Sequence, residues 1–212
     1  MSFVAPRRRE NWWLRLHPLA RSIDHRVPVE WVTKRATISR EHRYCYFRIP
    51  KCANSSVIRT LVQHDRELSA RTGGDTSLEA VKSRTGGLFH ALVGSPQTLA
   101  RRYRCFTVVR NPFTRVLSAY LDKIADAEPG QYAYVAYATG RDSITDVSFQ
   151  DFVEFLERGG LFANAHWAPQ TALLPVDPAN DLAFIGHQEQ LEADMRTLVE
   201  DILGLGPFQG MQ

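Results

Sequence analysis

The stretch YCYFRIPKCANSSVIR, residues 44–59, decides the fold of this chain of 212 residues. It opens with an apolar and aromatic run that is typical of a strand, turns through Ile49 to Asn54, and continues at helical spacing from Val57. A strand, a tight turn and a helix in this order predict a βα unit. The first N–H groups of a helix have no internal partners and carry partial positive charge, so the turn is predicted to bind an anion such as phosphate.

Lys51 lies in this turn and adds a full positive charge at the predicted anion site. The turn differs from the phosphate loop of nucleoside triphosphate-binding proteins, G-x-x-x-x-G-K-[ST]. Residues 44–65 contain no glycine, and Lys51 precedes the turn instead of closing it. The stretch is therefore predicted to bind phosphate by the same physics in a loop of another kind.

The rest of the chain alternates predicted strands with predicted helices. The short apolar runs at 105–110 and 182–186 are typical of strands that are buried on both faces. Capping residues and apolar spacing predict helices at 54–65, after Ser95-Pro96, after Asn111-Pro112, at 148–158 and at 189–203. The pattern predicts an α/β fold: a P-loop-like, three-layer domain with a central, mainly parallel sheet flanked by helices.

The remaining segments carry weaker signals. Residues 1–40 are polar and irregular, and we expect them to form an N-terminal extension that packs on a single domain over 41–212. Residues 67–87 are expected to be a loop with one short helix, and 130–146 to be loop or mixed structure.

The composition is that of an ordinary globular protein, with 44% hydrophobic residues, 23% charged residues and a net charge of +3. This charge does not call for nucleic acid as a partner. The three cysteines do not suggest a disulfide framework; Cys45 and Cys105 are expected to be buried, and Cys52 to lie in a more exposed loop. No segment reaches 18 consecutive apolar residues, so no membrane span is predicted.

Three blocks of this sequence resemble the sulfotransferases that use 3′-phosphoadenosine 5′-phosphosulfate (PAPS). PKCANSS, residues 50–56, resembles their 5′-phosphosulfate-binding loop, P-K-x-x-x-[ST]-[ST]. CFTVVRNPFTRVLSAYLDK, residues 105–123, resembles their 3′-phosphate-binding motif. NAHWAPQ at 164–170 and DLAFIGHQEQLEAD at 181–194 resemble the carbohydrate sulfotransferases of the chondroitin and HNK-1 type, sulfotransferase family 2. The resemblance implies that residues 41–212 form one sulfotransferase domain.

The resemblance implies PAPS as co-substrate, no required metal, and two anion sites for the two phosphate-bearing ends of PAPS. The first site would consist of Pro50, Lys51, Ala53, Asn54, Ser55 and Ser56. The second would consist of Arg110, at the end of a strand, and Ser118, two turns along the following helix. By resemblance, Lys51 would contact the bridging oxygen and neutralise the charge of the leaving group. Arg115 is expected to form a structural ion pair.

The acceptor is expected to be a hydroxyl group of a carbohydrate or of another compound, and a general base would help to deprotonate it. His90 lies upstream of the second motif, where some related enzymes keep their catalytic histidine. His166 lies in a matching block and either serves as the base or positions the acceptor. An aspartate or glutamate is a further candidate. No metal-ligand spacing such as HExxH or CxxC occurs.

Two other functions remain open at this point. A small-molecule kinase on the same strand-loop-helix plan would depend on magnesium, although the glycines of its phosphate loop are missing. A non-catalytic protein that binds glycans or nucleotides would keep Arg110 and Ser118 without turnover. The oligomeric state is open. Since the N-terminus lacks the anchor of Golgi relatives, we expect a soluble, cytoplasmic chain of bacterial type, and a Golgi lumen location only if an anchor was removed.

Overall fold

The computed structural model describes residues 16–73, 75, 77–85, 95–128 and 130–211. Its centre is a four-stranded sheet in the order β1-β2-β3-β4, formed by β1 (Ala36–Ser39), β2 (Tyr44–Phe47), β3 (Arg104–Val109) and β4 (Phe184–His187). Strands β2, β3 and β4 are parallel, and β1 pairs antiparallel with β2 at one edge. The α/β architecture with a mainly parallel sheet is confirmed.

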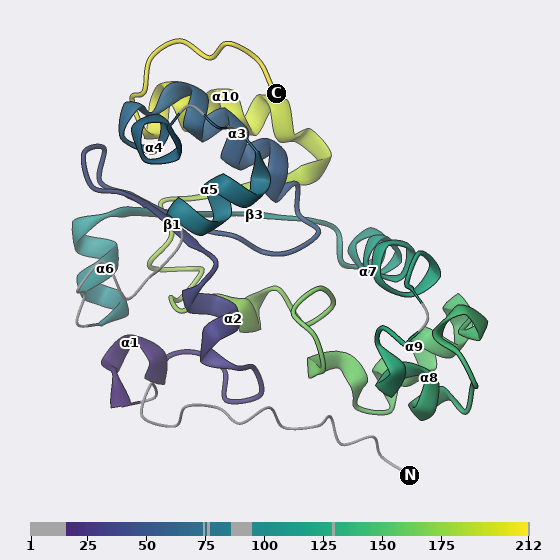
Figure 1. Cartoon of the computed structure of the whole chain (residues 1–212). Helices are drawn as coiled ribbons and strands as arrows, with labels where there is room; N and C mark the ends of the chain where they lie inside the picture. Colours follow the sequence, from purple (N-terminus) through teal and green to yellow (C-terminus); the bar gives the residue numbers. More distant parts are fainter. Residues whose placement is uncertain (1–15, 74, 76, 86–94, 129, 212) are drawn as a thin grey trace.

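Helices cover both faces of this sheet (Figure 1). One face is covered by α3 (Asn54–His64), α4 (Arg66–Thr72) and α10 (Leu191–Thr197), with α5 (Leu78–Thr85) packed on α3 and α4. The other face is covered by α1 (Pro18–Arg21), α2 (Val29–Thr33) and α6 (Pro96–Arg102). Beside the sheet lie α7 (Pro112–Tyr120), α8 (Ala133–Thr139) and α9 (Phe149–Glu157). The predicted three layers are present.

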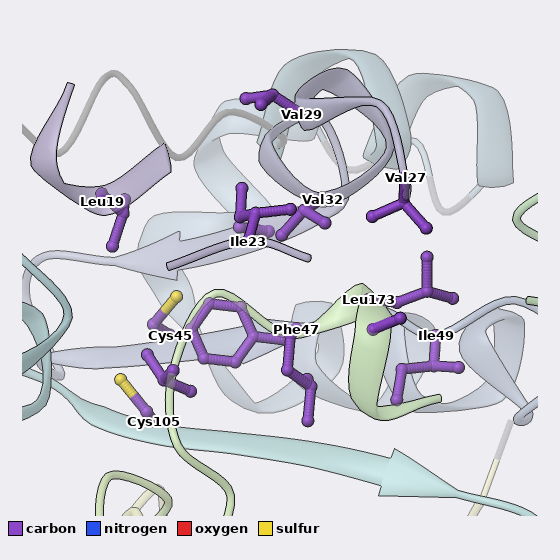
Figure 2. Close-up of a cluster of buried hydrophobic side chains, with 14 of the residues drawn as sticks. Leu19, Ile23, Val27, Val29, Val32, Cys45, Phe47, Ile49, Cys105 and Leu173 are labelled. Atoms are coloured by element: carbon purple, nitrogen blue, oxygen red, sulfur yellow. The ribbon is translucent and has the colours of Figure 1, made fainter. Parts of the chain in front are cut away.

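Alternating side chains of β2 explain why both faces are covered. Tyr44 and Tyr46 are buried in the cluster that contains α3 and α10. Cys45 and Phe47 point the other way, into the cluster with α1, α2 and Cys105 that Figure 2 shows. A parallel strand that is apolar on both faces needs a helical layer on each. Cys52 is also buried, so the expectation of an exposed cysteine in the loop is wrong.

The helices beside the sheet have an aromatic core of their own. Phe152 and Phe155 of α9 meet the fully buried Trp167, with ring centroids 5.2 Å and 6.5 Å from the indole. The indole Nε1 donates to the carbonyl of Gly160 at 3.0 Å. Helix α9 begins at the predicted cap, because Ser148 and Asp151 form a reciprocal capping box. This core fixes the 164–170 segment, which carries one of the sequence blocks.

Two segments differ from the sequence-based expectation. Residues 66–72 and 78–85 form two helices, α4 and α5, where a loop with one short helix was predicted for 67–87. The reason is Asp65, whose Oδ1 accepts the N–H groups of Glu67 and Leu68 and caps α4. Strand β1 lies within residues 1–40, so the expected N-terminal extension supplies an edge strand of the sheet.

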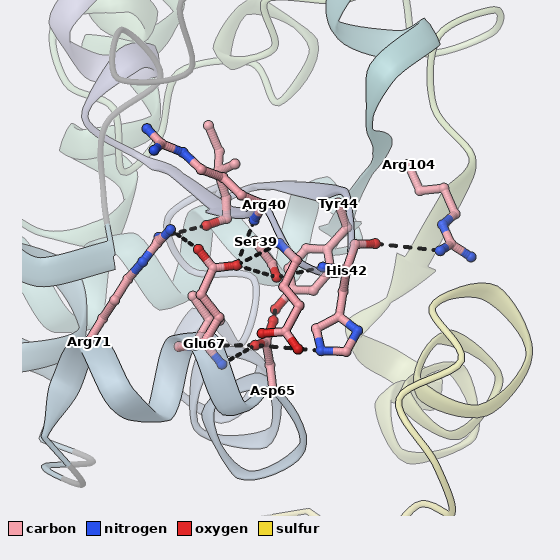
Figure 3. A network of polar contacts seen from close by, with 11 residues as sticks. Ser39, Arg40, His42, Tyr44, Asp65, Glu67, Arg71 and Arg104 are labelled. Atoms are coloured by element: carbon pink, nitrogen blue, oxygen red, sulfur yellow. Dashed lines mark hydrogen bonds and ion pairs between the residues drawn. The ribbon is translucent and has the colours of Figure 1, made fainter.

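A polar network joins the β1–β2 turn to α4 (Figure 3). Asp65 is completely buried, and its Oδ2 accepts the hydroxyl of Tyr44 at 2.7 Å. One oxygen of Glu67 accepts the hydroxyl of Ser39 at 3.0 Å and the backbone N–H groups of Arg40 and Glu41 at 2.7 and 2.8 Å. Two acidic side chains therefore hold the edge hairpin against the helical layer.

We expect Asp65→Ala to lower the free energy of unfolding by about 2–4 kcal/mol, because it removes the α4 cap and leaves the buried Tyr44 hydroxyl without an acceptor. Urea denaturation measures this. Asp75→Ala is the matched control, since Asp75 is exposed and accepts the local N–H of Ser77. A loss in Asp65→Ala no larger than in the control would contradict the network's role.

Candidate functional site

The loops that follow β2 and β3 open into a cleft of about 830 Å³ at the carboxyl ends of these strands. Ligands in open parallel sheets bind at this edge. The wall of the cleft contains most of the predicted site residues: Pro50, Lys51, Ala53, Asn54, Ser55, Arg110, Ser118 and His166. Ser56 follows on α3 and is not part of the wall. His90 lies outside the described residues.

The loop after β2 has the backbone of an anion site. Lys51 and Ala53 both have positive φ, 68° and 53°, a conformation that is uncommon for residues other than glycine. Positive φ at alternate residues turns successive N–H groups toward one side, as in anion-binding nests. Ala53 is the N-cap of α3 and has no side chain that can cap it, so the first N–H groups of this helix face the cleft uncapped.

Lys51 projects into the cleft and meets a carboxylate there. Its Nζ lies 3.0 Å from Oδ2 of Asp122, and Nζ of Lys123 lies 2.9 Å from the same oxygen. Both partners come from the π-helical turn Leu121–Ala125 that follows α7. Such wide turns are frequent at functional sites. Asp122 is therefore the counter-ion of two lysines in the cleft.

Arg110 follows β3, and the side chain of Gln170 holds its backbone through two hydrogen bonds. Its N–H donates to Gln170 Oε1 at 3.0 Å, and its carbonyl accepts from Gln170 Nε2 at 2.8 Å. The guanidinium donates to Thr114 Oγ1 at 3.1 Å and to the carbonyl of Lys51 at 3.4 Å. Among the described residues it forms no ion pair, although its charge contributes to lowering the pKa of Glu189. Ser118 lines the same cleft from α7, so the structure brings Arg110, Ser118 and the Lys51 loop together.

Arg115 differs from the expectation of an ion pair. It is buried and donates to three backbone carbonyls: Pro50 at 3.0 Å, Ala168 at 2.8 Å and Ala165 at 3.1 Å. No carboxylate among the described residues pairs with it, so the predicted ion pair is wrong. The five donors of a guanidinium suit such a junction of carbonyls. Arg115 ties α7 to the loop after β2 and to the 164–170 segment.

His166 faces the cleft as a neutral imidazole. Asn164 Oδ1 accepts the backbone N–H of His166 at 3.0 Å and lies 2.8 Å from its Nδ1, so Nδ1 carries the proton and Nε2 keeps a lone pair. Burial lowers the pKa of His166 to about 4, and the charges of Lys123, Arg35 and Lys51 act in the same direction. At neutral pH the ring is therefore uncharged, with the lone pair of Nε2 free of a proton.

Several residues of the wall were not among the predicted site residues. They are Pro28, Glu30, Trp31, Lys34, Arg35, Arg48, Asp122, Lys123 and Gln188. Asp122 and Lys123 are the last two residues of the second sequence block, 105–123. Their place in this block was the one signal in the sequence that could have indicated a role in the site. Arg35 and Arg48 come together only because β1 pairs with β2, which the sequence pattern did not predict.

Two features are absent from the part of the chain that the structure describes. No group of three or more His, Cys, Asp and Glu side chains there is arranged to hold a metal ion. No helix there combines the length and the apolar character needed to cross a membrane.

Comparison with known proteins matches residues 34–207 to the sulfotransferase family. The chain is 29% identical over 179 residues to carbohydrate sulfotransferase 14 of Danio rerio, covering 78% of this chain and 47% of the relative. It is 28% identical over 202 residues to carbohydrate sulfotransferase 10 of Xenopus laevis, a match that covers 82% of this chain and 54% of the relative. A third relative, carbohydrate sulfotransferase 14 of Mus musculus, is 27% identical over 175 residues, which cover 77% of this chain and 45% of the relative. No solved structure gave a significant match.

The chain spans about half the length of these relatives. All three are carbohydrate sulfotransferases of vertebrates. This finding overturns the expectation of a bacterial-type cytoplasmic chain.

We expect the pKa of His166 to be about 4 in the free protein and to rise when adenosine 3′,5′-bisphosphate fills the cleft, since added negative charge favours the imidazolium. NMR titration of the histidine rings measures this, and His166→Gln assigns the signal. Between about pH 6.5 and 4 the unfolded chain binds a proton that the folded protein does not, so this site destabilises the fold as the pH falls. A pKa near 6.5 that the ligand leaves unchanged would contradict this description.

Proposed function

Because this chain belongs to the sulfotransferase family, we propose that it transfers a sulfuryl group from PAPS to a hydroxyl group of a carbohydrate. One observation carries the proposal. The loops after two adjacent parallel strands, β2 and β3, each supply a cation to one cleft, and the guanidinium of Arg110 reaches the carbonyl of Lys51 at 3.4 Å. Two neighbouring anion sites suit a nucleotide that carries phosphate groups at both its 3′ and 5′ positions.

Each proposed role follows from a position in the cleft. The N–H groups from Ala53 to Ser56, the hydroxyl of Ser55 and the ammonium of Lys51 would hold the 5′-phosphosulfate, which supplies the activated sulfuryl group. Arg110 and Ser118 would hold the 3′-phosphate. The Gln170 amide supports this by fixing the backbone of Arg110 on both sides.

The proposed transfer needs alignment and charge neutralisation more than a covalent intermediate. The acceptor oxygen forms a bond to sulfur while the bond from sulfur to the bridging phosphate oxygen breaks. Nε2 of His166 takes the proton of the acceptor hydroxyl, and Asn164 holds the ring in the required tautomer. Lys51 neutralises the charge that grows on the departing phosphate oxygen.

The two alternative functions predict different experimental results. A kinase would require magnesium and a nucleoside triphosphate, and this chain has no glycine in the loop after β2. A non-catalytic binding protein would bind the nucleotide without transfer. Incubation with ³⁵S-labelled PAPS and a panel of glycans, with and without magnesium, separates the sulfotransferase from both alternatives: we expect label on a glycan in both conditions. A parallel incubation with γ-³²P-labelled ATP and magnesium then separates a kinase, which transfers label, from a binding protein, which does not.

We expect adenosine 3′,5′-bisphosphate to bind the protein without magnesium in a calorimetric titration. Lys51→Ala and Arg110→Ala should each weaken binding about 10–100-fold, since each removes a charge-assisted contact of about 1.5–3 kcal/mol. Arg158→Ala is the control, because that arginine pairs with Glu154 on the surface of α9. No binding by the folded wild type would exclude the sulfotransferase proposal.

Asp122→Asn should bind adenosine 3′,5′-bisphosphate several-fold more tightly than the wild type, most clearly at low salt. The substitution removes the carboxylate that neutralises Lys51 and Lys123 and that would compete with an incoming phosphate. The same titration measures it. Weaker binding would show that Asp122 positions Lys51 and does not compete with the ligand.

A further inference from the structure

The side of the cleft next to β1 holds two arginines that the proposed donor site does not use. Arg48 lies three residues before Lys51, and its N–H donates to the carbonyl of Arg35 at 2.8 Å. The side chain of Arg48 is buried; Nη2 donates to the carbonyl of Lys34 at 2.7 Å. Its Nε is also buried and has no hydrogen-bond partner among the described residues. Arg35 donates to the carbonyl of Trp31 at 2.8 Å.

These two guanidiniums have no counter-ion among the described residues. Burial lowers the pKa of Arg35 to about 10, with the charge of Arg48 acting in the same direction. Burial also lowers the pKa of Arg48. A buried cation with an unpaired donor is unfavourable unless something compensates it.

The acidic side chains of the cleft wall are already engaged elsewhere. Glu30 pairs with Lys34 at 3.2 Å, and Asp122 pairs with Lys51 and Lys123. Neither compensates Arg35 or Arg48. Among the described residues, the cleft wall therefore supplies no counter-charge to these two arginines.

His166, the proposed general base, lines the same cleft as these two arginines. The charges of Lys51, Lys123 and Arg35 all lower the pKa of His166, and all four side chains line the same cleft. The proposed donor already has a cation for each of its phosphate-bearing ends, Lys51 and Arg110. Arg35, Arg48 and His166 line one cleft, so an anion held by the two arginines lies in the same cleft as the imidazole that we propose to deprotonate the acceptor hydroxyl.

We propose that Arg35 and Arg48 bind an anionic group, a carboxylate or a sulfate ester, on the acceptor sugar chain. This inference rests on the proposed function and adds a specificity for acidic over neutral glycans. A guanidinium presents two parallel donors that match the oxygens of either group. Trp31 lines the same wall and is partly buried, so its indole offers a flat apolar surface for a sugar ring beside the charge.

The test measures binding directly, so that it does not depend on turnover. Protein loaded with adenosine 3′,5′-bisphosphate is titrated with a hyaluronan oligosaccharide and with the same oligosaccharide after reduction of its carboxylates to alcohols. A sulfated galactan oligosaccharide and its desulfated form make the second pair. The variants are Arg48→Gln and Arg35→Gln, with Arg158→Gln as the surface control; Arg35→Gln covers the case in which the more buried Arg48 is needed for folding.

We expect the wild type and Arg158→Gln to bind the charged member of at least one pair about tenfold more tightly than the neutral member. Either arginine variant should lose this preference and still bind adenosine 3′,5′-bisphosphate as the wild type does. A preference that survives in both variants, or no preference in the wild type, would overturn the assignment. Loss of nucleotide binding in the arginine variants would place these residues in the donor site and overturn it as well. Failure of the proposed function is recognised separately, by wild-type protein that does not bind the nucleotide.

Discussion

The cleft depends on one buried side chain, the guanidinium of Arg115. It donates to carbonyls of Pro50, Ala165 and Ala168, and so joins the loop after β2, helix α7 and the 164–170 segment. These are the three sequence blocks that resemble sulfotransferases. A lysine could not replace it, since a single ammonium does not reach three carbonyls in fixed directions. Lys51, Ser118 and His166 share one wall because this junction sets their distances.

Local signals in the sequence were sufficient for the βα units. The apolar run before Pro50, the capping residues Ser95, Asn111 and Ser148, and the run ending at Arg110 each specify an element through its own neighbours. Two strands in parallel then bring the ends of their loops to one edge of the sheet. For this reason the sequence predicts that the Lys51 loop and Arg110 lie at one edge of the sheet, as they do, whereas their proposed roles toward the donor come from the resemblance to sulfotransferases.

The other half of the cleft, next to β1, could not be predicted, because it depends on contacts between distant segments. The short β1 has no strong apolar pattern of its own and is stabilised by pairing with β2 and by the Glu67 contacts. Without that hairpin, Arg35 and Arg48 are two unrelated positions in the chain. Similarly, Asp122 enters the cleft through a π-helical turn that helical spacing does not indicate. A sequence pattern predicts local secondary structure, whereas this half of the cleft is formed by tertiary contacts.

The central claim is that one cleft holds both phosphate-bearing ends of one nucleotide, the 5′ end at the Lys51 loop and the 3′-phosphate at Arg110. The most direct test compares the affinities of adenosine 3′,5′-bisphosphate and adenosine 5′-monophosphate in the wild type, Arg110→Ala and Lys51→Ala. We predict a preference of at least about tenfold for the bisphosphate in the wild type, retained in Lys51→Ala and lost in Arg110→Ala. A preference that Arg110→Ala leaves unchanged would contradict the assignment.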